Sequence, residues 1–513
     1  MHDVVVVGSG PNGLAAAVTT ARAGLDVLVL EAQPTVGGGA RTLRDDHGLL
    51  HDVCSAVHPL AWASPFFREF DLAARGVELL VPEVSYAHPL PDGAAALAYR
   101  DLATTAASLG QDGDRWAATF GPLARDWEAL VGALLGRSVR PTPAALRGAA
   151  LAARYALGPV GARGVRSGPT DPFRTPAAQA LFAGVAAHTS TPLPGLAAGG
   201  TGALLGALAH APGGWPVPRG GSQAIVDALV ADLTAHGGRV EVDRPVRSRR
   251  DLPPARGYVL DTSPEAAREI LGGTRDVADP GERANGVSVA GAGAGAGAGA
   301  RARGRGLVRG WGVGARMSAA ARVDLVLDGP VPWEEPDVGR AGTVHLGGHR
   351  AEIVRAEAEV AAGGHAVRPV VLVSDPAVVD PTREVAGLRP LWTYAHVPLG
   401  SDRDVTDDVL AQLERFAPGV RDLVVDTRCT PAARMAEHDA NLVGGNISGG
   451  PVTVPRVLLG PRVRRSPWDT GHADAVLGSA STPPGPGVHG MGGWFAARRL
   501  LRGLGLSTPS LAP

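Results

Sequence analysis

Unbroken apolar runs near the start of the chain predict strands that are buried on both faces. Residues 4–7 are all valine, and a second apolar run covers residues 27–30. Runs of this kind are typical of a parallel sheet covered by helices. The Ala-rich segment between them, from residue 14 to about 23 and followed by Gly24, predicts a helix. The chain therefore opens with a predicted βαβ unit.

The later patterning predicts a return to this sheet and a second region rich in strands. An amphipathic helix is expected over residues 222–236, followed by short strands at 239–242 and 257–260. Strand-rich sequence then extends from 321 to about 399, and residues 392–397 alternate most clearly. We therefore expect an α/β protein with more than one sheet.

The turn between the first strand and helix carries the residues that a dinucleotide site needs. Gly8 permits a tight turn, Gly10 lets a pyrophosphate approach the backbone, and Gly13 lets the helix pack closely. The helix N-terminus is an anion site. Glu31 ends the second strand, where a carboxylate can accept the ribose hydroxyls. Together they favour the ADP end of a dinucleotide over a plain βαβ turn.

Two further Gly-rich segments favour FAD as that dinucleotide. Gly38, Gly39 and Arg41 could offer N–H groups and a guanidinium to phosphate and flavin atoms, although a surface arginine is the alternative. Near the C-terminus, a Gly- and Pro-rich loop leads into a helix predicted from about Gly490. The N-terminus of that helix would face the flavin and stabilise the negative charge of its reduced form.

Composition excludes several kinds of chemistry. A chain of 513 residues is too long for a single hydrophobic core, and a net charge of −1 gives no electrostatic argument for binding of nucleic acid. Cys54 and Cys429 form no CxxC pair, so a sequence-local redox disulfide is excluded, and two reduced thiols are expected rather than a structural disulfide between them. All 49 basic residues are Arg, so Schiff-base and pyridoxal phosphate chemistry on lysine is impossible.

The sequence predicts neither a metal site nor a membrane-spanning helix. No run of 18 apolar residues occurs, and the first strand begins at residue 3, so a cytoplasmic protein is expected. Residues 129–170 hold six Arg and no acidic residue, with Arg147 and Arg154 on a predicted amphipathic helix. This stretch is either a solvated helix face or a peripheral contact with an anionic membrane. Residues 286–309 are a low-complexity Gly/Ala/Arg insertion.

Motifs spread over nearly the whole chain resemble the phytoene desaturase-like NAD(P)/FAD-dependent oxidoreductases. Within that family the chain is most similar to the group containing pyridine nucleotide-disulfide oxidoreductase domain-containing protein 2. The resemblance is carried by these segments: Gly8-Ser-Gly-Pro-Asn-Gly13, residues 51–59, Asp261-Thr-Ser-Pro264, and residues 341–348, 441–446 and 479–490.

The resemblance implies a Rossmann-like FAD-binding domain of the glutathione-reductase/amine-oxidase type and a discontinuous α+β substrate domain. Residues 1–61, 200–265 and 425–513 would form the first, and residues 62–199 and 310–424 the second. FAD would be bound non-covalently. Its predicted contacts are Gly8, Gly10, Pro11, Gly13, Glu31, Ala32, Gly38, Gly39 and Arg41 at the ADP end, Val246 at the adenine, and Gly478, Val488, Gly490 and Met491 at the flavin end.

The reaction implied is hydride transfer to FAD from an apolar small molecule, in the manner of an isoprenoid or carotenoid dehydrogenase. His489 and His58 are candidate general bases or else structural histidines. Trp392, Tyr394 and His396 share one strand face and would line the substrate pocket or the core. NAD(P) could act as electron partner, but no second nucleotide motif is present.

Two alternatives stay open at this point. A flavin amine oxidase shares the fold, but many such enzymes use a lysine, and this chain has none. The chain could also be a flavoprotein that mainly binds a partner. The substrate, the electron acceptor and the oligomeric state are not fixed by the sequence.

Overall fold

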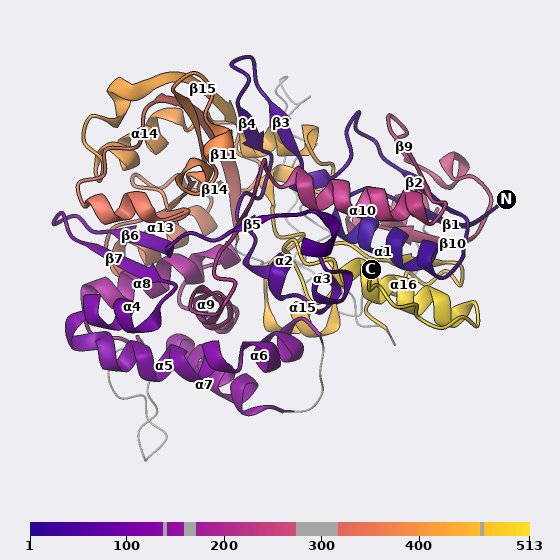
Figure 1. Ribbon diagram of the computed structural model, residues 1–513, viewed down its shortest axis with the longest axis horizontal. Helices are drawn as coiled ribbons and strands as arrows, with labels where there is room; N and C mark the ends of the chain where they lie inside the picture. The colour runs from indigo at the N-terminus through magenta and orange to yellow at the C-terminus, as the bar shows by residue number, and fades with distance from the viewer. Residues whose placement is uncertain (137–140, 159–170, 273–316, 462–465) are drawn as a thin grey trace, which may run out of the picture.

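The computed structural model describes residues 1–136, 141–158, 171–272, 317–461 and 466–513. Two sheets lie at opposite ends of the molecule in Figure 1, and a group of helices lies below the larger one. The predicted insertion at 286–309 lies outside the described residues, as do parts of the basic stretch 129–170.

The first sheet has five parallel strands and confirms the predicted βαβ start. Its strand order is β16-β10-β1-β2-β9, so the central strand β1 lies between β10 and β2. Segments far apart in the chain thus form one sheet, as the later patterning predicted. The strands are β1 (His2–Val7), β2 (Val27–Leu30), β9 (Arg239–Glu241), β10 (Ala255–Leu260) and β16 (Ala475–Leu477).

Small residues allow three helices to pack tightly at this sheet. Helix α1 (Pro11–Arg22) contacts α10 (Gln223–Ala235) and α16 (Met491–Gly503), while α11 (Pro264–Ile270) follows β10. A Cβ atom on Gly13 would lie 2.1 Å from the carbonyl oxygen of Gly8, and one on Gly493 would lie 1.7 Å from that of Asn12. Because backbone atoms are the obstacle, only glycine fits at these two contacts.

The second sheet has seven strands and is antiparallel except where β12 meets β6. Its order is β15-β11-β14-β13-β12-β6-β7. The predicted domain boundary at residue 425 falls inside β15, which pairs with β11 in this sheet. The strands are β6 (Val84–Pro89), β7 (Ala95–Tyr99), β11 (Ser318–Asp328), β12 (Thr343–Leu346), β13 (Val371–Ser374), β14 (Leu388–Pro398) and β15 (Val424–Thr430).

Helices surround the second sheet, and α9 lies at the centre of the group below it (Figure 1). Helix α9 contacts α5, α6, α7 and α8, and its Ala- and Gly-rich sequence lets these helices approach closely. The helices outside the first sheet are α2 (Pro59–Ala63), α3 (Pro65–Phe70), α4 (Leu102–Ser108), α5 (Gly113–Arg125), α6 (Trp127–Leu134), α7 (Pro143–Leu157), α8 (Pro176–Ala186), α9 (Leu196–Ala209), α13 (Arg350–Ala361), α14 (Thr406–Glu414) and α15 (Val454–Leu459).

A buried ion pair joins segments from the two halves of the chain. Asp52 ends β4 (Leu50–Asp52), which pairs with β3 (Thr42–Arg44), and its carboxylate binds the guanidinium of Arg383. It also accepts hydrogen bonds from the N–H of Ser222 at 2.9 Å and the hydroxyl of Thr42 at 2.6 Å. Burial alone would raise the pKa of Asp52, but Arg383 and these donors hold it below its ordinary value.

Candidate functional site

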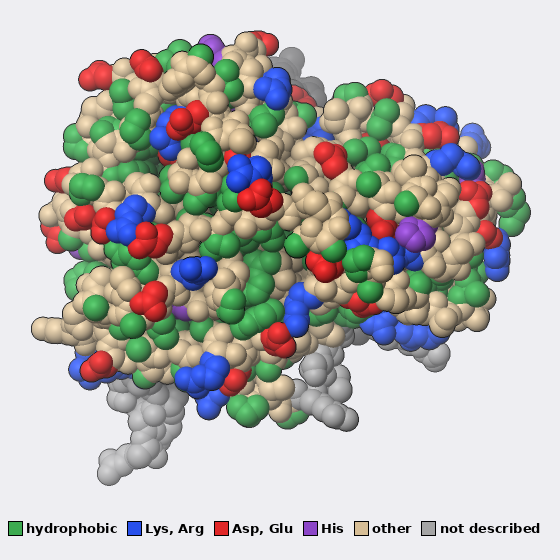
Figure 2. Space-filling model, in the orientation of Figure 1, with side chains coloured by type: hydrophobic (Ala, Val, Ile, Leu, Met, Phe, Trp, Pro, Cys, Tyr) green, Lys and Arg blue, Asp and Glu red, His purple; other side chains and the backbone are tan. Residues whose placement is uncertain are grey.

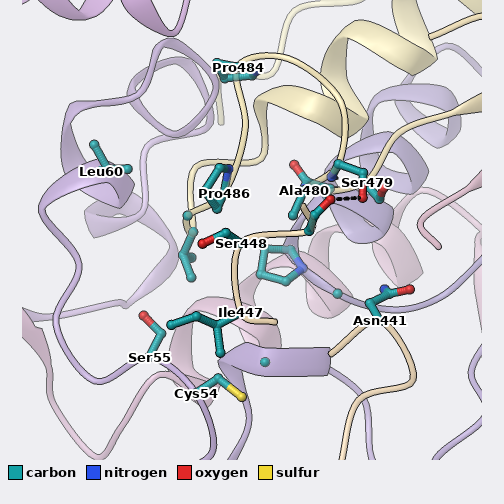
Figure 3. A pocket seen from close by; sticks show the side chains of 18 of the residues that line it. Cys54, Ser55, Leu60, Asn441, Ile447, Ser448, Ser479, Ala480, Pro484 and Pro486 are labelled. Atoms are coloured by element: carbon teal, nitrogen blue, oxygen red, sulfur yellow. Dashed lines mark hydrogen bonds between the residues drawn. The ribbon is translucent and has the colours of Figure 1, made fainter. Parts of the chain in front are cut away.

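One large cavity of about 850 Å³ extends from the first sheet to the helices around α9. It begins at the carboxyl ends of β1, β2 and β10, the edge at which open parallel sheets bind ligands. Figure 3 shows part of its wall, where Ser448, Ser479 and Pro486 lie across from Cys54 and Ser55. Its volume is at the upper end of the range of small-molecule sites.

Most residues predicted to contact the cofactor lie in the wall of this cavity. Those that line it are Gly8, Gly10, Pro11, Glu31, Ala32, Gly38, Gly39, Val246 and Val488. Gln33 and Arg244, which the sequence did not single out, lie beside them. The predicted residues Gly13, Arg41, Gly478, Gly490 and Met491 are absent from the cavity wall, and each has a neighbouring contact that explains its place.

Arg41 does not reach into the cavity. It is almost fully buried, and its guanidinium donates hydrogen bonds to the carbonyl of Gly38 at 2.9 Å, to the hydroxyl of Thr35 at 3.1 Å and to the carbonyl of His438. It therefore fixes the shape of the Gly-rich turn from behind. These bonds use three of the five N–H donors of the guanidinium, and Arg41 does not line the cavity, so its contact with phosphate or flavin atoms stays a prediction.

Glycines at the flavin end are required by close packing. A Cβ on Gly478 would lie 2.8 Å from the Cβ of Ala496 on α16. Gly490 has a φ of +68°, and a Cβ there would lie 2.5 Å from the ring of Phe66. These contacts fix the position of the loop formed by residues 479–488. Ser479, Ala480 and Val488 of this loop line the cavity.

Glu31 organises the first turn. Its Oε2 accepts hydrogen bonds from the N–H of Ser9 at 2.9 Å and from the Ser9 hydroxyl at 2.5 Å, and its Oε1 accepts one from the N–H of Gln33 at 2.8 Å. Each carboxylate oxygen has more than one lone-pair site. The side chain lines the cavity and can accept a further hydroxyl, as the predicted ribose contact requires.

Two further carboxylates lie at this end, and sequence reasoning missed both. Asp261, at the end of β10, accepts a hydrogen bond from the N–H of Gly13 at 2.8 Å, so it occupies a donor expected for phosphate. Burial raises the pKa of Asp261 to about 7, and the nearby charges of Asp439 and Glu31 add to the rise. Burial also raises the pKa of Asp439. Asp261 could have been found from the sequence, because it directly follows a strand predicted for the same sheet and so lies at the ligand-binding edge.

The N-terminus of α16 has its first N–H groups bonded within the protein, which corrects the expectation that they face the flavin. Met491 N–H donates to Nδ1 of His489 at 3.0 Å, and the N–H groups of Gly492 and Gly493 donate to the side-chain oxygen of Asn12 at 3.1 and 3.4 Å. The cavity wall here is the preceding loop. Only the helix dipole as a whole remains to act on a bound group.

His489 is held on both ring nitrogens by backbone groups. Its Nε2 donates to the carbonyl of Gly485 at 3.0 Å while Nδ1 accepts from Met491. The side chain is fully buried, it does not line the cavity, and burial lowers its pKa to about 4. The ring therefore fixes the loop that precedes α16 and has no nitrogen free for proton transfer.

His58 does line the cavity, and one of its ring nitrogens is free. Its Nε2 lies 2.7 Å from the hydroxyl of Ser222, which in turn donates to the carbonyl of Ser55, so Nε2 carries the proton. Nδ1 is buried and has no hydrogen-bond partner in the described structure. Because burial lowers the pKa of His58 to about 4, this neutral imidazole presents an unused lone pair.

Trp392 and Tyr394 line the opposite end of the cavity, whereas His396 lies behind them. The ring of His396 stacks on Tyr394 with centroids 5.6 Å apart, and its Nδ1 bonds to the buried carboxylate of Glu357. Glu357 also accepts from the hydroxyl of Ser318 at 3.0 Å. Of the three predicted pocket residues, two reach the cavity and the third supports them.

His188 is a cavity residue that no sequence pattern marked. Its Nε2 lies 2.8 Å from Nε2 of His345, so one ring donates and the other accepts. Burial, with a smaller effect of His396, lowers the pKa of His188 to about 3, and burial depresses the pKa of His345 as well. The two histidines are 157 positions apart in the chain, which is why neither one suggested the other.

The rest of this end is mostly apolar, although Thr189, Thr201, Thr343 and Ser374 also line the cavity. Its wall is formed by Leu135, which follows α6, and by these residues of α6, α7, α9 and α15: Leu130, Leu134, Ala145, Ala149, Ala152, Leu196, Ala197, Leu204, Leu205, Val454, Val457 and Leu458. Among the described residues, no group of three His, Cys, Asp or Glu side chains is placed to hold a metal ion. None of the described helices is long and apolar enough to cross a bilayer.

Comparison with known proteins agrees with the fold and with the position of the nucleotide end. Residues 6–70 match the model of the NAD(P)-binding Rossmann-like domain. The solved structure of cyclohexylamine oxidase from Brevibacterium oxydans superposes with a TM-score of 0.53 at 15% identity, covering 98% of this chain and 99% of that one. The chain therefore has the mixed α/β, Rossmann-like fold of the FAD-binding oxidoreductases, as predicted.

Two curated relatives are similar at lower identity or over a short stretch. Pyridine nucleotide-disulfide oxidoreductase domain-containing protein 2 of Rattus norvegicus is 24% identical over 98% of this chain and 94% of its own length. A limonene dehydrogenase chain of Castellaniella defragrans is 29% identical over 27% of this chain and 26% of its own length. The first agrees with the group that the sequence motifs indicated; a specific likeness to phytoene desaturases stays a prediction.

Proposed function

We propose that the protein is an oxidoreductase that binds FAD non-covalently and oxidises an apolar small molecule. The observation that carries the proposal is a continuous cavity, which joins the βαβ turn at one end to an apolar chamber at the other. FAD supplies a hydride acceptor when bound. The residues of the chain would bind it, orient the substrate and exclude water.

The chemistry of the cavity wall fits FAD. Gly8 and Gly10 lie in the wall and pack closely on Asp261, since a Cβ on either would lie within 2.8 Å of an Asp261 oxygen. Glu31 presents acceptor oxygens for a ribose, and Val246 lies in the wall beyond it, where the resemblance puts the adenine. His58 offers a buried, unpartnered ring nitrogen farther along the cavity, a natural partner for a polar edge of a bound ring.

Non-covalent binding is favoured by the state of the Cys54 thiol in the wall. Burial raises the pKa of Cys54 to about 12, so the thiol stays protonated and is a weak nucleophile at neutral pH. The chain has no lysine to take its place. The described wall therefore offers neither a cysteine thiolate nor a lysine amine that could form a covalent bond with the cofactor.

An apolar substrate is favoured by the apolar end of the cavity, which residues of α6, α7 and α9 line. Leucine and alanine dominate this wall, with Trp215, Trp392 and Tyr394 at its inner end. One relative is named for limonene, a terpene hydrocarbon, which is consistent with an isoprenoid-like substrate. His188 is the polar side chain at this end whose hydrogen bond to His345 fixes its orientation.

The test begins with the purified protein. We expect the purified protein to be yellow. After acid precipitation, the flavin absorbance should appear in the supernatant and not in the protein pellet, because the flavin is not covalently attached. Anaerobic mixing with limonene or a polyene should bleach the flavin band. A colourless protein that binds no added FAD contradicts the proposal.

A second candidate, a flavin amine oxidase, is favoured by the structural neighbours. A single-substitution variant of putrescine oxidase superposes with a TM-score of 0.55 at 15% identity over 98% of this chain and 99% of that one. Bleaching by putrescine or cyclohexylamine, with none by terpenes, would identify this activity. If neither class of donor reduces a bound flavin, a partner-binding role is favoured instead.

A further inference from the structure

Exposed apolar side chains gather at one end of the cavity. Of the twelve large apolar side chains that are exposed among the described residues, seven lie on α6, α7, α9 and α15. We call these seven the apolar rim: Leu134, Leu146, Leu157, Leu196, Val454, Leu458 and Leu459. Single exposed leucines are ordinary, whereas a group around an opening marks an interaction site.

The apolar rim surrounds the mouth of the cavity. Four of its members are exposed to solvent and also line the cavity, namely Leu134, Leu196, Val454 and Leu458. Leu146 and Leu157 are about three turns apart on α7 and so share one side of that helix. Figure 1 shows α6 and α7 along the lower edge of the molecule, and hydrophobic side chains reach that edge in Figure 2.

Arginine outnumbers acidic residues on the rim helices, although Asp126 and Glu128 lie at the start of α6. Residues 129–136, 141–158, 195–209 and 451–460 contain no Asp or Glu. Arg147 and Arg154 are exposed on α7 about two turns apart, so they also share one side. Asp126 approaches Arg147 at 3.5 Å, but both are exposed and such a pair is weak.

We propose that the apolar rim docks on an anionic lipid bilayer, with Arg147 and Arg154 against the headgroups. An apolar surface bordered by arginine, with few acidic residues beside it, is the pattern of an interfacial contact. Docking in this way opens the cavity directly into the acyl region, so an apolar molecule can enter without crossing water. The contact is independent of the reaction, and it requires no helix that spans the bilayer.

The test is co-sedimentation of the full-length protein with vesicles. Phosphatidylcholine vesicles with one third phosphatidylglycerol should bind the protein, and vesicles of phosphatidylcholine alone should bind it less. Leu458→Asp should weaken binding about tenfold, because a charge replaces an inserted side chain. Arg147→Gln with Arg154→Gln should weaken binding about fivefold for each arginine at low salt, and added salt should reduce that difference.

Matched controls lie away from the rim. Val367→Asp puts the same charge at an exposed apolar position between α13 and β13, and Arg403→Gln with Arg421→Gln removes two exposed arginines near α14. Both controls should bind vesicles as the wild type does. If Leu458→Asp does not fold, the arginine pair and Leu459→Asn test the same surface.

Three results overturn the proposal. Wild-type protein that binds neither kind of vesicle contradicts docking of the rim on a bilayer. If the rim variants bind vesicles as tightly as the control variants do, the membrane contact lies elsewhere on the protein. A wild-type dimer that Leu458→Asp converts to a monomer, without vesicle binding by either, shows that a second copy of the chain covers the rim.

Discussion

The two ends of the cavity are built by different means. The nucleotide end depends on backbone atoms in near contact, as where Gly13 meets Gly8 within one short turn and Asp261 packs against both. The substrate end depends on side chains from distant segments, such as His188 and Tyr394, packed around open space. The first arrangement tolerates almost no added atom, while the second can accept many side chains of similar size.

The largest contrast should come from the same substitution at the two ends. Gly13→Ala places a Cβ 2.1 Å from the Gly8 carbonyl, so we expect a loss of more than ~4 kcal/mol of stability and of bound flavin. Gly200→Ala, on the cavity side of α9, meets no atom within 4 Å and should be neutral or stabilising by about 0.5–1 kcal/mol. Urea midpoints and flavin content measure both; equal effects would remove the distinction.

A smaller loss is expected at the junction between the two halves. Arg383→Met leaves the Asp52 carboxylate buried without its cation, which should cost about 3–5 kcal/mol. Arg219→Met removes an exposed partner of Glu78 and should leave the thermal midpoint unchanged. If the two variants melt alike, the buried pair does not hold the halves together.

The nucleotide end should also respond to pH through Asp261. Its folded pKa of about 7 lies above the ordinary value of 3.8, so its contribution is fully present below 3.8 and is lost as pH rises through about 7. Asp261→Asn should therefore flatten the fall in thermal midpoint over that range while keeping an acceptor for Gly13. Identical pH profiles for variant and wild type would show that folding does not raise the pKa of Asp261.

The smallest effect is expected at the substrate end. Trp392→Phe keeps an aromatic ring, and the indole N–H that it removes has no hydrogen-bond partner in the described structure. We expect a change in stability below about 1.5 kcal/mol, measured in the same urea titrations. A loss as large as that of Gly13→Ala would mean that this end is packed as strictly as the other.

Prediction from sequence was most successful where the signal was local. The strands at 4–7 and 27–30, the helix between them and the glycine turn were all expected, because each follows from periodicity and from what glycine permits. The helix at 222–236 and the strands around it were expected for the same reason. The sequence predicted that Arg41 and His489 act on the cofactor or substrate, but it could not show that Arg41 bonds to the carbonyl of His438 in a distant loop, or that His489 bonds to the carbonyl of Gly485 within its own loop.

Local patterning thus determined a βαβ dinucleotide turn, an α/β class and chemistry without lysine. The tertiary structure alone decided that Asp261 lies against Gly13, that His188 pairs with His345, and that leucines of four helices surround one opening. The reason is physical: periodicity records which face of an element is buried, but not which distant element covers it. The partners of a buried polar group are fixed only when the sheets and helices pack.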